Sequence, residues 1–356
     1  MASPSNLRLT GLDFDELRTN FKNYLATQDE FTDYDTTGSA FSVLLDVLAY
    51  NTHVNSFYLN MIANEMFIDT AIKRNSLMSL SKMLGYLPKS RKSSYANVTI
   101  AVTPTDSPSN VTIAKNTRFK SEINGITFSF VTDQSYSEVA NGNSTVTIPN
   151  VKLVQGEPLT FRYTANTSDH SIKYKIPNTG VDTDSVTVTL QESEDNTSQS
   201  TYTLASDLLN INSSSNVFFL EPDSDDTYQV KFGDDILGRK EKTGNIVIIG
   251  YNITNGSLGN GARIFSPVST VGGYAGASVT TISASIGGSD EESNDGIRFN
   301  APRHYEVQNR AVTANDYKRI ITREYPQVES VVVYGGETAD PPQYGKVFVG
   351  IKPKSG

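Results

Sequence analysis

The sequence predicts an α+β protein, in which an N-terminal helical segment precedes antiparallel β domains and a helical insertion lies near the C-terminus. Three changes of pattern along the 356 residues indicate this class. Apolar residues from Ala40 to Asn64 recur with the period of a helix, whereas from Tyr95 they alternate as in half-buried strands. Helical periodicity returns between Asn294 and Tyr325, and two further strand patterns follow it.

These patterns divide the chain into five expected segments. We expect a flexible arm at residues 1–11, a helical segment at 12–88 and an antiparallel β domain at 95–226. A second β domain is expected at 227–288, followed by a helix-rich α+β segment at 289–356. Because the chain stops soon after a strand, the last segment looks like an interrupted domain.

The long helix predicted from Ala40 to Asn64 carries more apolar surface than a surface helix needs. Most of its polar side chains gather on one narrow strip, which comprises Ser42, Asp46, His53, Ser56, Asn60 and Asn64. The remaining apolar arc is roughly twice the stripe of an ordinary surface helix. Such a helix is either buried inside its own domain or part of a bundle completed by other chains. The chain offers few other helices, which favours the second interpretation.

The residues expected in this bundle come from the long helix and from a third helix. One face comprises Phe41, Leu44, Leu45 and Leu48, the other comprises Val47, Phe57, Tyr58 and Met61, and the third helix supplies Leu77, Leu80 and Leu84. Asn51, Thr52 and Asn55 interrupt the apolar surface in the middle of the long helix. They need hydrogen-bond partners if they are buried.

Short signals mark the ends of these N-terminal helices. Asp13 begins a first helix, and Ser39 is an N-cap residue for the long one. The third helix is predicted from about Asp69, with Ile72 on its inner face, and Gly85 ends it.

Alternating strands fill the middle of the chain, with Pro, Asn and Gly between them at short intervals. The clearest strand patterns begin at Val98, Ile126, Leu159, Val186, Tyr228 and Asn245. We assign Gly233, Gly238 and Gly261 to tight backbone turns and not to ligands.

Two helices and two strands are expected near the C-terminus. The first helix runs from about Asn294 to Gln308 and is broken at Pro302. The second begins after Thr313, which forms a capping pair with Asp316, and ends near Tyr325. Strands are predicted at 328–334 and 346–351.

The composition argues against several classes of function. A net charge of −9 does not suit a protein that binds nucleic acid, and the basic cluster Lys89, Arg91 and Lys92 is interpreted as a solvated linker between domains. The chain has no cysteine, so it forms no disulfide framework and no thiolate metal site. No apolar run reaches the ~18 residues of a membrane span, and no signal peptide pattern opens the chain. We expect a soluble protein that folds in a cytoplasm and has no membrane partner.

Residue patterns for catalysis or metal binding are weak. The histidines His53, His170 and His304 have no partner at ligand spacing, which argues against zinc. The segment from Gly233 to Gly238 is either a hairpin turn or a phosphate cradle, and its two aspartates favour the turn. The acidic residues at 223–226 form either a calcium site or an acidic turn, and their spacing favours the turn. We expect no cofactor and no metal.

Several segments resemble proteins of contractile phage tails. Phe232-Gly-Asp-Asp-Ile-Leu-Gly238, Gly244 to Tyr251 and Gly259-Asn-Gly-Ala262 are similar to the signature of J-like baseplate proteins, as are the acidic Gly287 to Ser293 and the segment Arg310 to Tyr317 that follow. Phe31-Thr-Asp-Tyr-Asp35, Leu44 to Thr52 and Gly85-Tyr-Leu-Pro88 resemble the larger, inner baseplate wedge subunit of T-even-type phages. On this resemblance, residues 227–288 are a J-like β domain. The T-even-type relatives continue well beyond the last residue of this chain.

The resemblance implies a non-enzymatic structural subunit of the virion, located in the tail baseplate and assembled in the host bacterial cytoplasm. In that family a subunit pairs with a second copy of itself, and the two hold a partner baseplate wedge protein in a helical core bundle. Neighbouring wedges close an inner ring around the hub, where a lysozyme-like sheath initiator and a LysM-bearing wedge protein also bind. The ring rearranges when the sheath contracts.

Two other functions remain open at this level. Many short Thr-rich strands are also typical of a host-binding tail fibre or adhesin, although such proteins seldom begin with three amphipathic helices. A polysaccharide-degrading tail enzyme needs two carboxylates about 5–10 Å apart in a groove, which a sequence alone does not reveal.

Overall fold

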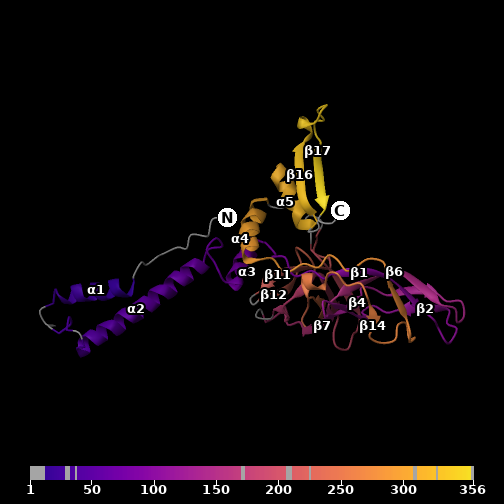
Figure 1. The fold of residues 1–356 in the computed structure, drawn as a ribbon, viewed down its shortest axis with the longest axis horizontal. Helices are drawn as coiled ribbons and strands as arrows, with labels where there is room; N and C mark the ends of the chain where they lie inside the picture. Colours follow the sequence, from indigo (N-terminus) through magenta and orange to yellow (C-terminus); the bar gives the residue numbers. More distant parts are fainter. Residues whose placement is uncertain are drawn as a thin grey trace. The chain divides into compact units, whose positions relative to one another are not determined.

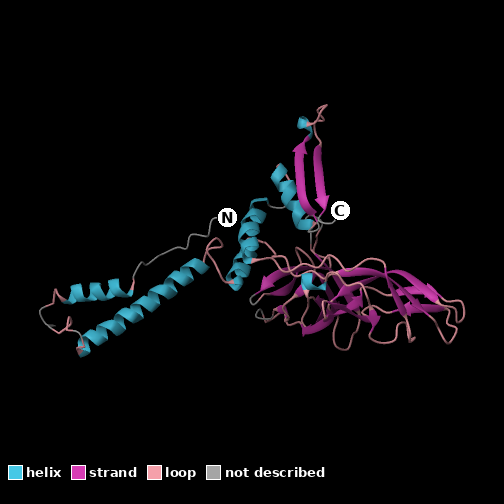
Figure 2. Cartoon of the chain, in the orientation of Figure 1, coloured by secondary structure: helices cyan, strands magenta, loops and turns pink. Residues whose placement is uncertain are grey.

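The fold is described from a computed structural model. The described residues are 13–28, 33–36, 38–169, 173–205, 211–223, 226–307, 311–325 and 328–353. The arm expected at residues 1–11 lies outside them. The chain forms two compact units, Met1–Met83 and Leu84–Gly356. The first contains helices and the second is mostly β structure with two further helices, so the predicted α+β class is confirmed (Figure 2).

Three helices make up the described part of the first unit. They are α1 (Phe14–Leu25), α2 (Ala40–Glu65) and α3 (Arg74–Met83). Asp13 caps α1, and the Ser39 hydroxyl accepts a hydrogen bond from the Ser42 backbone N–H at 3.0 Å to cap α2. Both caps are the ones that the sequence predicts, because short polar side chains satisfy the first N–H groups of a helix.

The third helix begins later than predicted, at Arg74 instead of about Asp69. A turn precedes it, in which the Glu65 carboxylate accepts hydrogen bonds from the backbone N–H groups of Ile72 at 3.0 Å and Lys73 at 3.2 Å. Those bonds hold the chain out of the helix. Ile72, expected on the inner face, is 59% exposed.

The described strands of the second unit form two large sheets and two two-stranded sheets, β2 with β5 and β16 with β17. Their bounds are β1 (Tyr95–Val102), β2 (Asn110–Ile113), β3 (Arg118–Ile123), β4 (Ile126–Thr132), β5 (Tyr136–Val139), β6 (Val146–Gln155), β7 (Glu157–Thr164), β8 (Tyr174–Ile176), β9 (Val181–Gln191), β10 (Gln199–Leu204), β11 (Val217–Asp223), β12 (Thr227–Phe232), β13 (Ile246–Ile253), β14 (Ser266–Pro267), β15 (Ser278–Thr281), β16 (Val328–Gly335) and β17 (Val347–Pro353). Short 3₁₀ turns lie at Gly256–Gly259 and Gly336–Thr338.

The first sheet has six strands in the order β14-β3-β4-β6-β1-β15, and Figure 1 shows its central strands side by side. Every second residue of β1 is buried, including Val98, Ile100 and Val102. These side chains pack with Phe119 and Phe130 in one apolar core, as the two-residue period predicts.

The second sheet has seven strands in the order β7-β13-β9-β10-β11-β12-β8. β13 lies next to the edge strand β7 and pairs antiparallel with β7 on one side and β9 on the other. Among the described strands, the one parallel contact joins β10 to β11. The boundary that we placed after residue 226 falls between β11 and β12, which pair along their whole length. The domain boundaries stay a prediction.

Two helices and a hairpin complete the second unit. They are α4 (Asn294–Val307), α5 (Ala314–Glu324) and the antiparallel pair of β16 and β17. Thr313 and Asp316 form the capping box that the sequence predicts for α5.

The break predicted at Pro302 is wrong. α4 continues through this proline as one helix from Asn294 to Val307. A proline removes one helical hydrogen bond and crowds the carbonyl four residues before it, but the rest of a long helix can hold the chain in place. The Arg303 guanidinium donates to the Phe299 carbonyl oxygen at 2.6 Å on the same stretch, which satisfies a neighbouring acceptor.

The basic residues at 89–92 are joined to the second unit and do not form a free solvated linker. The Arg91 guanidinium pairs with the Glu291 carboxylate, and Lys92 pairs with Asp184 at 2.5 Å. The backbone N–H of Lys92 also donates to the Ser289 carbonyl oxygen at 2.9 Å. Arg91 and Lys92 are therefore paired with carboxylates from distant parts of the sequence.

Candidate assembly interface

The long helix α2 extends beyond the helix that pairs with it. α2 has 26 residues and α1 has 12, which correspond to lengths of about 39 Å and 18 Å at the helical rise. α1 lies antiparallel beside the N-terminal part of α2 in Figure 1. It therefore covers less than half of the length of α2.

The contact between α1 and α2 combines one apolar residue with one ion pair. Leu17 is the residue of α1 that is buried, and Leu45 and Ala49 are buried on α2. The Arg18 guanidinium lies 2.6 Å from the Asp46 carboxylate, and both side chains are about one-third exposed. Solvent screens a pair of this exposure, so it fixes the register of the two helices more than it stabilises them.

The buried side of α2 is mostly small or polar, whereas its large apolar side chains are exposed. Ser42, Ser56, Ala63 and Asn64 are buried. Leu44, Leu48, Val47, Phe57 and Tyr58 are between 52% and 63% exposed. This is the reverse of a surface helix in a monomer, which turns its apolar side inward. Contiguous exposed apolar surface of this kind marks an interaction site.

Most of the exposed apolar residues of α2 fall on two strips, each with a heptad spacing of four and three residues; exposed Leu59 lies outside both. The leucine strip comprises Leu44, Leu48, Asn51, Asn55, Tyr58 and Ile62. The valine strip comprises Val43, Val47, Tyr50, Val54, Phe57 and Met61. Val54 and Met61 are half-buried, and the other members of both strips are exposed. Two such strips side by side are typical of a helix that packs against two other helices at once.

The residues predicted for the bundle differ in their exposure. Leu44, Leu48, Val47, Phe57 and Tyr58 are exposed, whereas Phe41, Met61, Leu80 and Leu84 are half-buried and Leu45 and Leu77 are buried. Leu45 was grouped with Leu44 and Leu48, but it lies on the side that α1 covers. The role of all these residues in an interface stays a prediction.

The polar residues in the middle of α2 make hydrogen bonds within the helix. The Asn55 amide donates to the Asn51 side-chain oxygen at 3.2 Å, and the Thr52 hydroxyl donates to the Leu48 carbonyl oxygen at 2.9 Å. Both asparagines are exposed on the leucine strip. Each amide keeps further hydrogen-bonding capacity, so the pair can bond a polar group on an approaching helix.

The predicted turn glycines occupy tight backbone positions. Gly238 and Gly261 have φ of +89° and +95°, a region that favours glycine. A Cβ atom on Gly233 would lie 2.2 Å from the Gly238 carbonyl oxygen. Asp234 accepts hydrogen bonds from the backbone N–H groups of Ile236 and Leu237 in the same turn, and these bonds lower the pKa of its carboxyl.

In the second unit, Glu292 joins α4 to the segment that leads into β1. Its carboxylate accepts hydrogen bonds from the Tyr86 hydroxyl at 2.8 Å, the Lys89 backbone N–H at 3.0 Å and the Asn300 amide at 2.6 Å. No local pattern predicts this cluster, because Tyr86 and Lys89 lie about two hundred positions before Glu292. The acidic run before α4 indicates only that carboxylates gather there.

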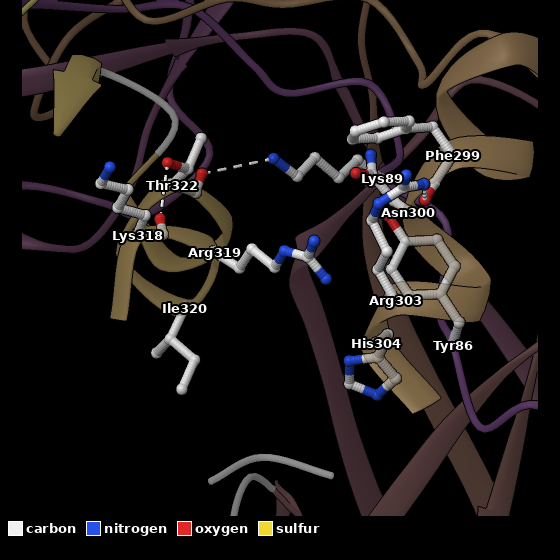
Figure 3. Close-up of a pocket in the computed structure, with 10 residues that line it drawn as sticks. All are labelled: Tyr86, Lys89, Phe299, Asn300, Arg303, His304, Lys318, Arg319, Ile320 and Thr322. Carbon is white, nitrogen blue, oxygen red and sulfur yellow. Dashed lines mark hydrogen bonds between the residues drawn. The ribbon is translucent and has the colours of Figure 1, made fainter. Parts of the chain in front are cut away.

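A basic cavity of about 280 Å³ lies next to this cluster, between α4 and α5. Its wall includes Tyr86, Lys89, Phe299, Arg303 and Arg319, and none of its ten lining residues is acidic. Figure 3 shows Arg319 extending from α5 toward the wall that carries Arg303. The Lys89 ammonium spans the space and donates to the Thr322 carbonyl oxygen at 3.5 Å. No sequence pattern indicates this cavity, because its basic residues come from three separate segments, at Lys89, at Arg303 and at 318–319.

The structure gives no support to a metal site in the part of the chain that it describes. No group of three His, Asp or Glu side chains there has the geometry to hold a metal ion. His53 lies on α2 and His304 on α4, and His170 and Asp225 lie outside the described residues. Asp223 pairs with Lys175 at 3.3 Å. Among the described helices, none has the length and apolar character of a membrane span.

Two family models match the chain at its two ends. Residues 13–86 match the helical domain of gp6-like baseplate wedge proteins, and residues 313–356 match C-terminal domain I of the baseplate structural protein gp6. The baseplate wedge protein gp6 of Enterobacteria phage T4 is 26% identical to this chain. The alignment has a length of 373 residues, gaps included, and covers 96% of this chain. Both ends of the chain are thus similar to gp6 baseplate wedge proteins.

The gp6-like helical domain contains α1, α2 and α3, and with them every residue that we predicted for the bundle. The gp6 C-terminal domain I contains α5, β16 and β17. The matching domains are thus those of a structural baseplate protein. The chain spans about half the length of the T4 protein, at 54%. The likeness to J-like proteins stays a prediction.

A solved baseplate structure is also similar to this chain. It is the baseplate of the anti-feeding prophage, with 11% identity and a TM-score of 0.33 over 91% of this chain and 67% of that one.

Proposed function

We propose that this protein is a structural subunit of a contractile-tail baseplate wedge, and that α2 holds the wedge together through an intermolecular helical bundle. One observation carries the proposal: α2 lies in a gp6-like helical domain and exposes two strips of large apolar side chains. Burying one such side chain is worth about 1.5–3 kcal/mol, so an interface that covers both strips strongly favours association.

The two strips support two different partner helices. One neighbour alone would cover either the leucine strip or the valine strip and leave the other in water. We assign one strip to a second copy of this protein and the other to a partner baseplate wedge protein. This arrangement follows the resemblance to the inner wedge subunit, and the breadth of the apolar surface agrees with it.

The β sheets of the second unit act as rigid spacers and ring contacts in this proposal. Neighbouring wedges, a lysozyme-like sheath initiator and a LysM-bearing wedge protein are the expected contacts in the ring. Interfaces of packed helices repack between discrete arrangements and do not bend smoothly, which suits a ring that rearranges when the sheath contracts. The protein is then a virion component of the tail baseplate, assembled in the host cytoplasm, without enzymatic activity or cofactor.

Mass in solution tests the bundle. The chain is expressed alone and with its wedge partner, and sedimentation equilibrium gives the mass of each complex. We expect association for the native chain and its loss for Leu48→Glu, which places a charge on the leucine strip. Asn23→Glu on the exposed part of α1 is the matched control and leaves association intact. A stable monomer that ignores wedge partners would contradict the proposal.

The two alternative functions predict different results. A host-binding fibre binds intact host cells, and a polysaccharide-degrading enzyme releases reducing sugar from the host capsule or cell-wall polysaccharide. The proposed structural role predicts neither activity for the purified chain.

A further inference from the structure

We propose that the basic cavity between α4 and α5 binds a carboxylate-bearing segment of another protein. The cavity lies in the second unit, and none of its lining residues belongs to α2. Three features indicate this ligand class: the positive charge of the cavity, the planar guanidinium groups on its wall, and the contacts that its aromatic rings already make.

The charge of the cavity is opposite to that of the protein as a whole. The chain carries a net charge of −9, yet Lys89, Arg303, Lys318 and Arg319 all line this one cavity, and no acidic residue does. The carboxylate that pairs with Arg319 belongs to Glu306 and lies 3.7 Å away, at the outer limit of an ion pair. Like charges on the wall of one cavity repel one another, and an anion placed among them relieves that repulsion.

Two of these cations have the form that carboxylates prefer. Arg303 and Arg319 each present a planar guanidinium group, which binds a carboxylate through two parallel hydrogen bonds. They come from the two helices that face each other across the cavity, and Figure 3 shows Arg319 directed toward the Arg303 wall. A carboxylate between them would contact both helices at once.

The aromatic rings of the cavity are already engaged, which argues against nucleic acid. The Arg303 guanidinium carbon lies 3.5 Å from the centre of the Phe299 ring, and the Tyr86 ring packs on His304 with centres 5.5 Å apart. Single-stranded nucleic acids bind by stacking bases on open aromatic faces along a basic groove. A protein of net charge −9 also repels a long polyanion, whereas a short acidic segment carries little total charge.

The size of the cavity agrees with a side chain or two of a peptide. Its volume of about 280 Å³ lies just below the usual range of about 300–1,000 Å³ for small-molecule pockets. The apolar side chain of Ile320 and the ring of Phe299 line the same space. We therefore expect the segment to carry an apolar residue beside its acidic ones.

The test is a binding titration on the full chain. The probe is a fluorescein-labelled pentapeptide of sequence Glu-Glu-Phe-Glu-Glu, blocked at both ends, and binding is followed by fluorescence anisotropy. The comparison peptide replaces each Glu by Gln. We expect Arg303→Gln and Arg319→Gln each to weaken binding of the acidic peptide about tenfold, because each removes a charged hydrogen-bond donor. The Gln peptide should bind at least tenfold more weakly than the acidic one.

The control is Arg263→Gln, which changes the net charge equally at an exposed position outside the cavity. It should leave the affinity within twofold, and circular dichroism checks that each variant is folded. Absence of binding, or equal weakening by Arg263→Gln, would overturn the proposal. Equal or tighter binding of a thymine oligonucleotide, weakened by the same two cavity substitutions, would also overturn it in favour of nucleic acid.

Discussion

At the scale of single residues, Asn51 and Asn55 are the most informative positions of the proposed interface. They sit in the middle of the leucine strip and hydrogen-bond to each other. An asparagine inside an apolar helix interface lowers its stability but fixes the register and number of helices, because a mismatched register leaves the amide without a partner. We therefore assign the pair to specificity of assembly.

The double substitution Asn51→Leu and Asn55→Leu tests this role. It makes the leucine strip wholly apolar, so we expect tighter association together with a mixture of complex sizes. Sedimentation velocity measures both properties. Complexes of the same single size and affinity as those of the native chain would show that the asparagines do not set specificity.

Glu65 makes the turn between α2 and α3 sensitive to acid. Burial alone would raise the pKa of this carboxyl, but hydrogen bonds from the Ser76 side chain and from the Ile72 and Lys73 N–H groups outweigh it and lower the pKa. A carboxyl with a lowered folded-state pKa stabilises the fold above its unfolded pKa of about 4.3. That stabilisation is lost as the pH falls through the folded value.

The corresponding variant is Glu65→Gln. At neutral pH it should reduce the free energy of unfolding of the helical unit by about 1 kcal/mol, because a neutral amide oxygen accepts hydrogen bonds from the same N–H groups less strongly than a carboxylate does. The difference from the native chain should shrink toward zero at acidic pH, once the pH has fallen through the folded-state pKa and Glu65 itself is protonated. Urea unfolding followed by circular dichroism at both pH values gives the comparison. A difference that does not change with pH would contradict the assignment.

At the scale of elements, the sequence predicts helix ends best. Asp13, Ser39 and the Thr313–Asp316 pair all cap the helices that they were expected to cap. These signals are local, because each residue bonds a backbone group within three positions. The β strands were also found at their alternating patterns, since one face of each sheet is buried.

Features that depend on distant residues were not predictable in the same way. The helix α4 runs through Pro302, and the start of α3 is delayed by a carboxylate nine residues earlier. The order of strands in the seven-stranded sheet and the contacts of Glu292 join parts of the chain that no local pattern connects. Long-range packing overrides local preference at such positions.

The cap of α2 yields a prediction for this scale. Ser39→Ala removes the hydroxyl that accepts the Ser42 N–H, and should cost about 1 kcal/mol of helix stability. Hydrogen exchange read by mass spectrometry should show faster exchange in the first turn of α2. The control is Ser79→Ala, at an exposed position inside α3. It should leave exchange in the first turn of α2 unchanged, and exchange in α3 unchanged or slower, because alanine favours helices. Equal exchange in the two variants would refute the role of the cap.

At the scale of the whole molecule, the chain combines well-packed sheets with a helical unit that leaves its apolar side exposed. The first sheet encloses a continuous apolar core, in which Phe119 and Phe130 are fully buried. The long helix α2 instead buries Ser42 and Ser56 and exposes Leu48 and Phe57. A chain that folds around such a helix gains stability when other chains cover it.

Solvent access to α2 in the assembled particle tests this central claim most directly. The chain has no cysteine, so Leu48→Cys introduces a single thiol on the leucine strip whose maleimide labelling reports exposure there. We predict that this thiol reacts readily in the isolated chain under conditions that prevent association, and at least a hundredfold more slowly in intact baseplates. Denatured baseplates should restore full labelling. A thiol that reacts as fast in intact baseplates as in denatured ones would show that no neighbour covers α2, and would contradict the proposed role in assembly.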